Sequence, residues 1–162
     1  MKYVILLWLL FFSNVVFAET TSYRPALQPS VIIFVSFSMP KESIKGWVRE
    51  GEIIHAPVVL RGLVNNSFKD TIKKVNELIQ DNHGGVQIDP TLFQRFNVNK
   101  VPAVVVVKST ICLPSQTCPD EFDVIYGDVK LEYALRKIID KKDNLSPIAE
   151  EALKILREAK HA

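Results

Sequence analysis

The sequence predicts an α/β fold in which parallel strand–helix–strand units come first and an antiparallel hairpin comes late. Continuous β-branched and aromatic runs at 31–35, 57–60 and 103–107 are typical of strands buried on both faces. Apolar residues at helical spacing follow the first two runs, over 44–48 and 68–79. Early strands alternating with helices imply a parallel pair joined by a right-handed crossover.

The first 18 residues are predicted to be a secretion signal that is removed. Lys2 is a short basic n-region, 3–12 is an uninterrupted apolar run, and 16–18 is a small-x-small cleavage site. Ser13 and Asn14 end a run that is shorter than the roughly 20 residues of a spanning helix, so cleavage is favoured over an anchor. The mature protein is therefore expected in a bacterial periplasm, where thiols oxidise.

The chain divides into a signal peptide at 1–18, a flexible polar segment at 19–30, a folded domain at 31–140 and a C-terminal helix at 141–162. Removal of 18 from 162 residues leaves 144, enough for one domain with its own core. The net charge of +2 gives no case for nucleic acid or a membrane surface as partner. No second membrane segment, repeat or low-complexity tract is present.

The first two helices have recognisable starts. Ser38 suits an N-cap, and Pro40 fits the first turn of a helix that carries Ile44, Trp47 and Val48 on one face. The loop 65–67 ends in a second N-cap. The apolar positions of the helix that follows are Phe68, Ile72, Val75 and Ile79.

The second half alternates in the same way. A short strand at 86–88 leads to Asp89-Pro90, an N-cap with a first-turn proline, and to a short helix through Phe93 and Phe96. The strand at 103–107 and another at 122–126 form the hairpin. Gly127-Asp128 is expected to cap the next helix, and Ser146-Pro147 to start the last. The apolar positions expected on these two helices are Leu131, Leu135 and Ile138, then Ile148, Ala152, Ile155 and Ala159.

This order of elements is the thioredoxin-like arrangement. Val101-Pro102 precedes the third long strand, so Pro102 is the candidate cis-proline. A thioredoxin-like oxidoreductase carries Cys-x-x-Cys after its first long strand, where a helix N-terminus makes the first thiol a thiolate. The equivalent stretch here is 36–39, Ser-Phe-Ser-Met, and serine cannot exchange disulfides. We therefore expect a thioredoxin-like fold that lacks a Cys-x-x-Cys active site.

The two cysteines, Cys112 and Cys118, are expected to form a disulfide, because an even count in an exported chain predicts pairing. The loop is short, so the entropic model gives about 2 to 2.5 kcal/mol of stabilisation. Its role would be to fix a loop. A redox role for these cysteines is the alternative, and the missing Cys-x-x-Cys argues against it.

Other catalytic interpretations are weak, and no metal or cofactor is expected. His55, His83 and His161 have no metal-ligand spacing. Asp89 is interpreted as an N-cap. Arg61 follows a buried strand, where a structural ion pair or a snorkelling side chain is favoured over a partner-facing role.

The site predicted from the sequence is therefore a binding groove. The space between the first helix N-terminus and the proline loop would be lined by Phe37, Met39 and Pro102, with Arg61 a further candidate. Apolar and soft side chains there suit an extended peptide or a partner loop. The structural alternative is that Phe37 and Met39 are packed core.

The chain resembles one family, TrbC of F-type conjugative transfer systems. The matching segments, which together span roughly residues 31 to 138, are 34–40, 57–63, 85–93, 101–105 and 131–135. The resemblance implies a non-enzymatic part in assembling the conjugative pilus of a plasmid-encoded type IV secretion system. It implies other periplasmic transfer proteins as partners, and TraW is the one that the family suggests. The alternatives are a periplasmic thiol–disulfide oxidoreductase or isomerase, and a general chaperone.

Overall fold

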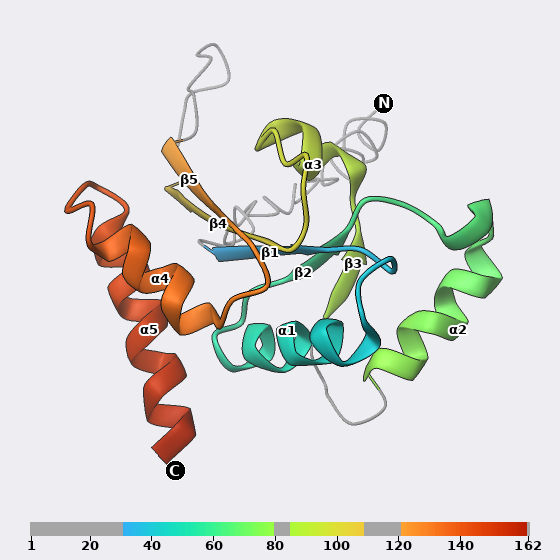
Figure 1. The fold of residues 1–162 in the computed structure, drawn as a ribbon, viewed down its shortest axis with the longest axis horizontal. Helices are drawn as coiled ribbons and strands as arrows, with labels where there is room; N and C mark the ends of the chain where they lie inside the picture. The colour runs from blue at the N-terminus through green and yellow to red at the C-terminus, as the bar shows by residue number, and fades with distance from the viewer. Residues whose placement is uncertain (1–30, 80–84, 109–120, 162) are drawn as a thin grey trace, which may run out of the picture.

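The computed structural model describes residues 31–79, 85–108 and 121–161, and these form a mixed five-stranded sheet with helices packed on it. Figure 1 shows the arrangement. Apart from a short 3₁₀ turn at Val64–Asn66, the order and type of the elements are those that the sequence predicts. The elements are β1 (Val31–Val35), α1 (Lys41–Ile53), β2 (Val58–Leu60), the 3₁₀ turn η1 (Val64–Asn66), α2 (Phe68–Ile79), β3 (Val86–Ile88), α3 (Pro90–Arg95), β4 (Ala103–Lys108), β5 (Glu121–Tyr126), α4 (Leu131–Ile139) and α5 (Ser146–His161).

The strands are ordered β3-β2-β1-β4-β5. β1 pairs with β2, and β2 with β3, in parallel. β4 is antiparallel to both β1 and β5. The central strand β1 therefore has a neighbour on each side and helices on both faces, and all five of its residues are buried. This explains why its sequence is continuously apolar and does not alternate.

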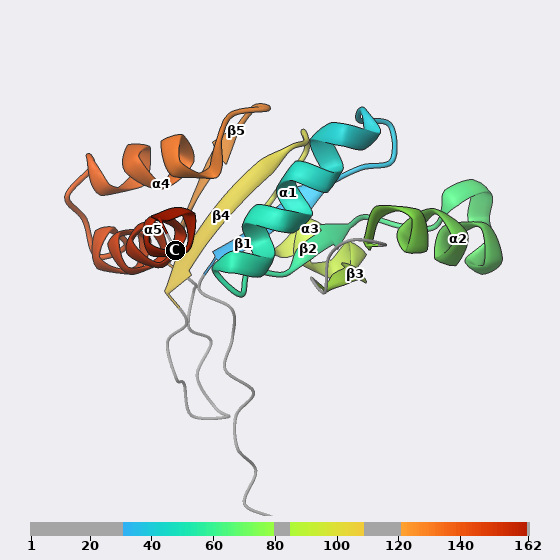
Figure 2. The ribbon, with the colours of Figure 1, turned by 90° about the horizontal axis from the view of Figure 1, so that it is seen from below.

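The two faces of the sheet are covered unequally (Figures 1 and 2). Helices α1, α4 and α5 cover one face, where Ile33 and Val35 pack in one cluster with Trp47, Leu135 and Leu156. The six-residue helix α3 covers the other. The core of this second face is aromatic, and Phe34 is its fully buried centre. The centroid of its ring lies 4.7 Å from that of Phe93 and 6.3 Å from that of Phe96, both edge-to-face.

The predicted N-cap of α1 is wrong. Pro40, not Ser38, is the residue at the cap position, and no side chain caps this helix end. The Ser38 hydroxyl instead donates a hydrogen bond to Ser36 Oγ at 3.0 Å. Local hydrogen bonding within the turn thus competes with capping, as is common for serine.

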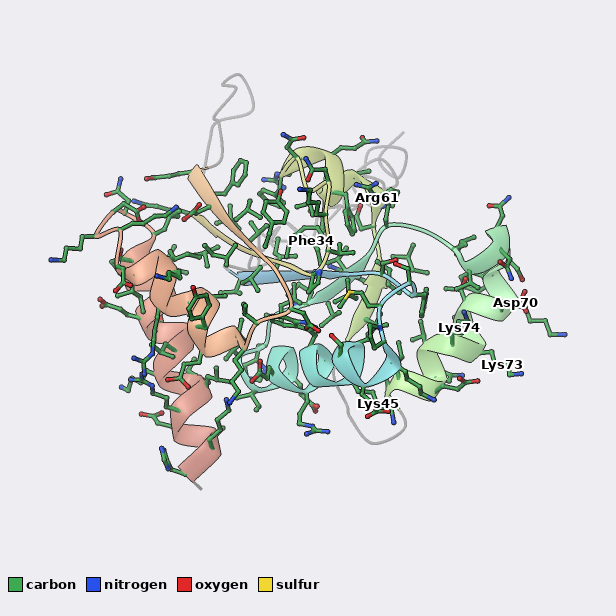
Figure 3. All side chains as sticks on the ribbon, viewed as in Figure 1. Phe34, Lys45, Arg61, Asp70, Lys73 and Lys74 are labelled. Atoms are coloured by element: carbon green, nitrogen blue, oxygen red, sulfur yellow. The ribbon has the colours of Figure 1, made fainter. Side chains whose placement is uncertain are left out.

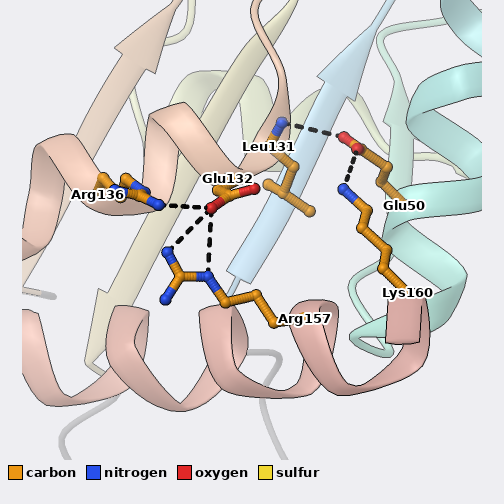
Figure 4. Close-up of polar contacts among 6 residues, drawn as sticks. All are labelled: Glu50, Leu131, Glu132, Arg136, Arg157 and Lys160. Atoms are coloured by element: carbon orange, nitrogen blue, oxygen red, sulfur yellow. Dashed lines mark hydrogen bonds and ion pairs between the residues drawn. The ribbon is translucent and has the colours of Figure 1, made fainter. Parts of the chain in front are cut away.

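The predicted cap of α4 is also wrong, and the reason is tertiary. Lys130 is the cap residue. Asp128 Oδ1 accepts a hydrogen bond from Trp47 Nε1 at 3.2 Å, so its carboxylate fixes α1. Glu50 of α1 supplies the missing cap, because its Oε2 accepts a hydrogen bond from the Leu131 N–H at 3.0 Å (Figure 4).

The C-terminal helix α5 is part of the main core, which is the cluster of buried residues on the α1 side of the sheet. The buried face of α5 differs from the predicted one. Ile148, Ile155 and Ala159 of the expected stripe are not among its buried residues, and Ala152 is. The buried residues of α5 are Ser146, Ala149, Ala152, Leu153 and Leu156. The buried face is therefore turned by about one residue from the predicted stripe.

Charged contacts hold α5 against α4 and α1 (Figure 4). Glu132 Oε1 accepts hydrogen bonds from Arg157 Nη2 at 2.9 Å and from Arg136 Nη2 at 2.8 Å. These hydrogen bonds, that of Arg136 first, lower the pKa of Glu132 to about 2. Lys160 Nζ lies 3.3 Å from Glu50 Oε1. One carboxylate of α1 thus contacts both α4 and α5.

The sheet edge at β5 is protected by a charged side chain. Asp123 Oδ1 accepts a hydrogen bond from the Val124 N–H at 2.9 Å. The other oxygen of Asp123 pairs with Lys141. One backbone donor of the edge strand is therefore already occupied.

Asp89 is the N-cap of α3, as the sequence predicts. Its Oδ1 accepts hydrogen bonds from the Thr91 N–H at 2.8 Å, the Leu92 N–H at 3.3 Å and the Thr91 hydroxyl at 2.6 Å. The Thr91 hydroxyl is the largest cause of the lowered pKa of Asp89, and the two backbone bonds add to it against partial desolvation. The charged carboxylate therefore stabilises the folded state.

Replacing Asp89 with Ala is expected to lower the free energy of unfolding by about 1 kcal/mol, within the usual range for a lost cap. Because the pKa is lowered on folding, the wild-type contribution is present above the unfolded pKa and is lost as the pH falls through the folded pKa. Urea titrations at pH 7 and pH 3 measure both effects. Asp89→Asn keeps a capping oxygen, so at pH 7 it should lose less free energy of unfolding than Asp89→Ala. An equal loss in the two variants would contradict a capping role.

Candidate partner-binding site

The turn between β1 and α1 is closed by its own hydrogen bonds. The Met39 N–H donates to the Ser36 carbonyl at 3.0 Å, and the Ser38 N–H donates to Ser36 Oγ at 3.3 Å. The two hydroxyls are bonded to each other. No basic side chain lies within hydrogen-bonding distance of either hydroxyl in the described part of the chain. This turn therefore positions Phe37 and Met39.

A cavity of about 130 Å³ lies beside this turn, between the start of α1 and α2. Its apolar wall includes Phe37 and Met39, which are half-buried and pack against the main core. Its charged rim includes Lys74, whose Nζ lies 5.6 Å from the centroid of the Phe37 ring. The cavity is well below the roughly 300 Å³ of a small-molecule site, so its size suits one apolar side chain. The lining residues are Phe37, Met39, Lys41, Ile44, Lys74, Glu77 and Leu78.

Pro102 is not part of this lining. The Val101–Pro102 peptide bond is cis, which is the isomer expected from the sequence. Pro102 is buried, and its carbonyl accepts a hydrogen bond from the Gly127 N–H at 3.0 Å. The proline thus joins the start of β4 to the end of β5.

Arg61 lies on the opposite side of the sheet, near α3 (Figure 3). Its Nη2 donates a hydrogen bond to the Val98 carbonyl at 2.6 Å, and its guanidinium lies 4.9 Å from the centroid of the Phe93 ring. The two contacts hold α3 and the loop after it against the segment that follows β2. The structure therefore groups Phe37 with Met39 and places Pro102 and Arg61 elsewhere.

A larger cavity, of about 450 Å³, lies between α1, the β5–α4 connection and α5. Sequence patterns did not indicate it, because its walls come from segments far apart in the chain. Its acidic groups already have partners: Glu50 contacts Lys160, and Asp128 accepts hydrogen bonds from Ser43 and Trp47. These contacts connect helices, so we interpret this cavity as a structural junction.

The described residues contain no group of three or more His, Cys, Asp or Glu side chains that could hold a metal ion. No helix in the described ranges is long and apolar enough to cross a bilayer. The predicted signal peptide, the predicted flexible segment 19–30 and the predicted pair Cys112 and Cys118 lie outside the described residues.

The fold and this site define a mixed α/β protein with a small apolar cavity at a strand–helix junction that lacks a thiol. Residues 33–138 match the family described as type-F conjugative transfer system pilin assembly protein, TrbC. The chain belongs to this family, as the resemblance in its sequence predicted.

A curated relative supports the assignment. The chain is 35% identical over 129 residues to periplasmic protein TrbC of Escherichia coli strain K12. The match covers 79% of this chain and 56% of the relative, so the chain spans little more than half the length of the curated protein it matches. No solved structure matches the chain.

Proposed function

We propose that this chain is a periplasmic assembly factor for the conjugative pilus of an F-type type IV secretion system, and that it acts by protein–protein binding without catalysis. Family membership supports the assembly role. The predicted leader and the name of the curated relative support the compartment. The partners would be other periplasmic transfer proteins, and TraW is the partner that the resemblance suggests.

The proposed scaffold is thioredoxin-like. Its support is the parallel β1–α1–β2 unit followed by the antiparallel β4–β5 pair and a helix. A thioredoxin-like oxidoreductase would carry its thiols in the turn after β1. Here that turn presents Phe37 and Met39 to a cavity between two helices.

This cavity is the observation that carries the proposed mechanism. It has the size of one side chain, and its wall combines an aromatic ring with a thioether, which adapts to irregular shapes. An apolar side chain from an extended partner segment would fill it, and its charged rim would orient polar groups beside it. The cysteines Cys112 and Cys118 take no part in this mechanism and are proposed to form a disulfide.

The double substitution Phe37→Ala and Met39→Lys is expected to weaken binding to TraW at least about ten-fold, since it removes one wall of the cavity and puts a charge on another. Isothermal titration calorimetry with purified TraW measures the affinity. Thermal unfolding should stay nearly unchanged, because both side chains are only half-buried.

Two controls accompany this experiment. Tyr133→Ala removes an aromatic side chain that is 49% exposed on α4, and it should leave TraW binding unchanged. Ser36→Ala should also be tolerated, since no nucleophile is assigned there. Loss of pilus formation in Ser36→Ala alone, or insulin reduction by the wild-type protein, would contradict the non-catalytic mechanism.

A further inference from the structure

The outer side of α2 has an apolar stripe that the described part of the chain leaves largely uncovered. The sequence predicts one apolar face on this helix, formed by Phe68, Ile72, Val75 and Ile79. The helix forms over this range, but its buried residues are Thr71 and Leu78. Phe68 is 66% exposed and Ile72 is 41% exposed. We call these two exposed residues the α2 stripe.

The α2 stripe is held rigidly. Thr71 is fully buried, and its hydroxyl donates a hydrogen bond to the Ser67 carbonyl at 2.7 Å and accepts one from the Val64 N–H at 2.8 Å. Ser67 Oγ accepts a further hydrogen bond from the Asp70 N–H at 3.2 Å. These bonds fix η1 and the first turn of α2 together. A preordered surface loses less conformational entropy when a partner binds.

Positive charge borders the stripe on one side. Lys69 and Lys73 each follow a stripe residue by one position, about 100° around the helix. Among the described residues neither has an ion-pair partner, whereas Lys74 lies over the Phe37 ring. Asp70 lies about 60° around the helix from Lys73 and offsets part of its charge, but it is about 160° from both stripe residues. Lys69 and Lys73 are therefore the charged side chains of α2 closest to the stripe. Figure 3 shows Asp70 and Lys73 at the end of α2 that projects away from the sheet.

We propose that the α2 stripe is a docking surface for an acidic amphipathic helix of another protein. The i, i+4 spacing of Phe68 and Ile72 matches the ridge that one helix presents to another. Asp or Glu residues beside the partner's apolar face would meet Lys69 and Lys73, and would make binding weaken with salt.

A protein helix fits this surface better than a lipid bilayer does. A helix that lies on a membrane exposes apolar side chains along its whole length. Here Val75 and Ile79, which continue the stripe, are half-buried and pack against the main core. The α2 stripe is also distinct from the cavity of Phe37 and Met39, so the inference goes beyond the proposed function.

Two designed helical peptides test the inference. They share one apolar pattern at i, i+3, i+4 and i+7, and differ in having Glu or Lys beside it. Fluorescence anisotropy with the full mature chain should show the Glu peptide binding at least about ten-fold more tightly than the Lys peptide, with a smaller difference at high salt. Equal affinity for the two peptides, or no binding of the Glu peptide, would overturn the proposal.

Substitutions locate the contact. Phe68→Ser with Ile72→Ser should weaken Glu-peptide binding at least about ten-fold, and Lys69→Glu with Lys73→Glu should reverse the preference. Two matched controls are Tyr133→Ser and the pair Lys100→Glu and Lys137→Glu. They should change neither the affinity for the Glu peptide nor the preference for it over the Lys peptide. Unchanged melting temperatures would show that the variants fold, and losses as large in the controls would overturn the assignment to α2.

Three further measurements establish which surface binds and what occupies it. Phe37→Ala with Met39→Lys should leave Glu-peptide binding intact, which distinguishes this surface from the TraW site. Sedimentation with phosphatidylglycerol vesicles that depends on Phe68 would identify a membrane contact instead. A dimer that dissociates on Phe68→Ser would identify a second copy of this chain as the occupant. Either of the last two results would overturn the proposal.

Discussion

Phe34→Ala is expected to lower the free energy of unfolding by about 3 to 5 kcal/mol, the range for truncating a buried aromatic residue. Phe34 is 0% exposed, and it packs edge-to-face against both Phe93 and Phe96. Among the described residues, the only helix on this face is the short α3. Its Phe93 side chain packs against the Phe34 ring. The cavity left by the substitution is therefore expected to loosen α3 as well.

Urea denaturation followed by circular dichroism measures this loss. Phe122→Ala is a matched control, because its ring lies 5.1 Å from that of Phe96 but is at the sheet edge, where the residue is 37% exposed. Phe122→Ala should lower the free energy of unfolding by less than half as much as Phe34→Ala does. Similar losses in the two variants would mean that the aromatic cluster, and not burial at β1, determines stability on this face.

Deleting the gene from its transfer system is expected to abolish or severely reduce pilus production and mating. Family membership as a pilin assembly protein motivates this result. Pili counted by electron microscopy and mating efficiency from a donor strain measure it. Complementation with the wild-type gene or with Ser36→Ala should restore both, whereas Phe37→Ala with Met39→Lys should restore them poorly. Normal pili on cells that lack the protein would remove the assembly role.

The element order was predictable because strand and helix signals do not overlap in this sequence. β1 and the first five residues of β4 are continuously apolar, since each strand has neighbouring strands on both sides and helices on both faces. Asp89-Pro90 marks the start of α3 from local hydrogen bonds alone. Such signals come from residues that are close together in the chain, so they can be recognised from the sequence alone.

The helix caps and helix faces were less predictable because tertiary contacts determine them. Asp128 is a good capping residue by type, yet its carboxylate binds Trp47, and Glu50 from α1 caps α4 instead. On α5, two overlapping apolar patterns share Ala152, and only packing against α4 selects the one that contains Leu153 and Leu156.

The candidate site was predictable in part. The sequence predicted a groove lined by Phe37, Met39 and Pro102; the structure places Phe37 and Met39 on a cavity whose other wall is α2, without Pro102. The contribution of α2 to that cavity was not foreseen, since Lys74 reaches it only through helix packing. The exposure of Phe68 was also unexpected: helical periodicity shows which residues share a face but not whether anything covers that face.

The protected edge at β5 limits how this protein can associate with others. With Asp123 bonded to Val124 and paired with Lys141, an incoming strand would have to displace a charged side chain before it could extend the sheet. Copies of the chain are thereby discouraged from pairing with one another through β5. In a crowded compartment, association is thus directed away from this backbone edge and towards side-chain surfaces, which can select among partners.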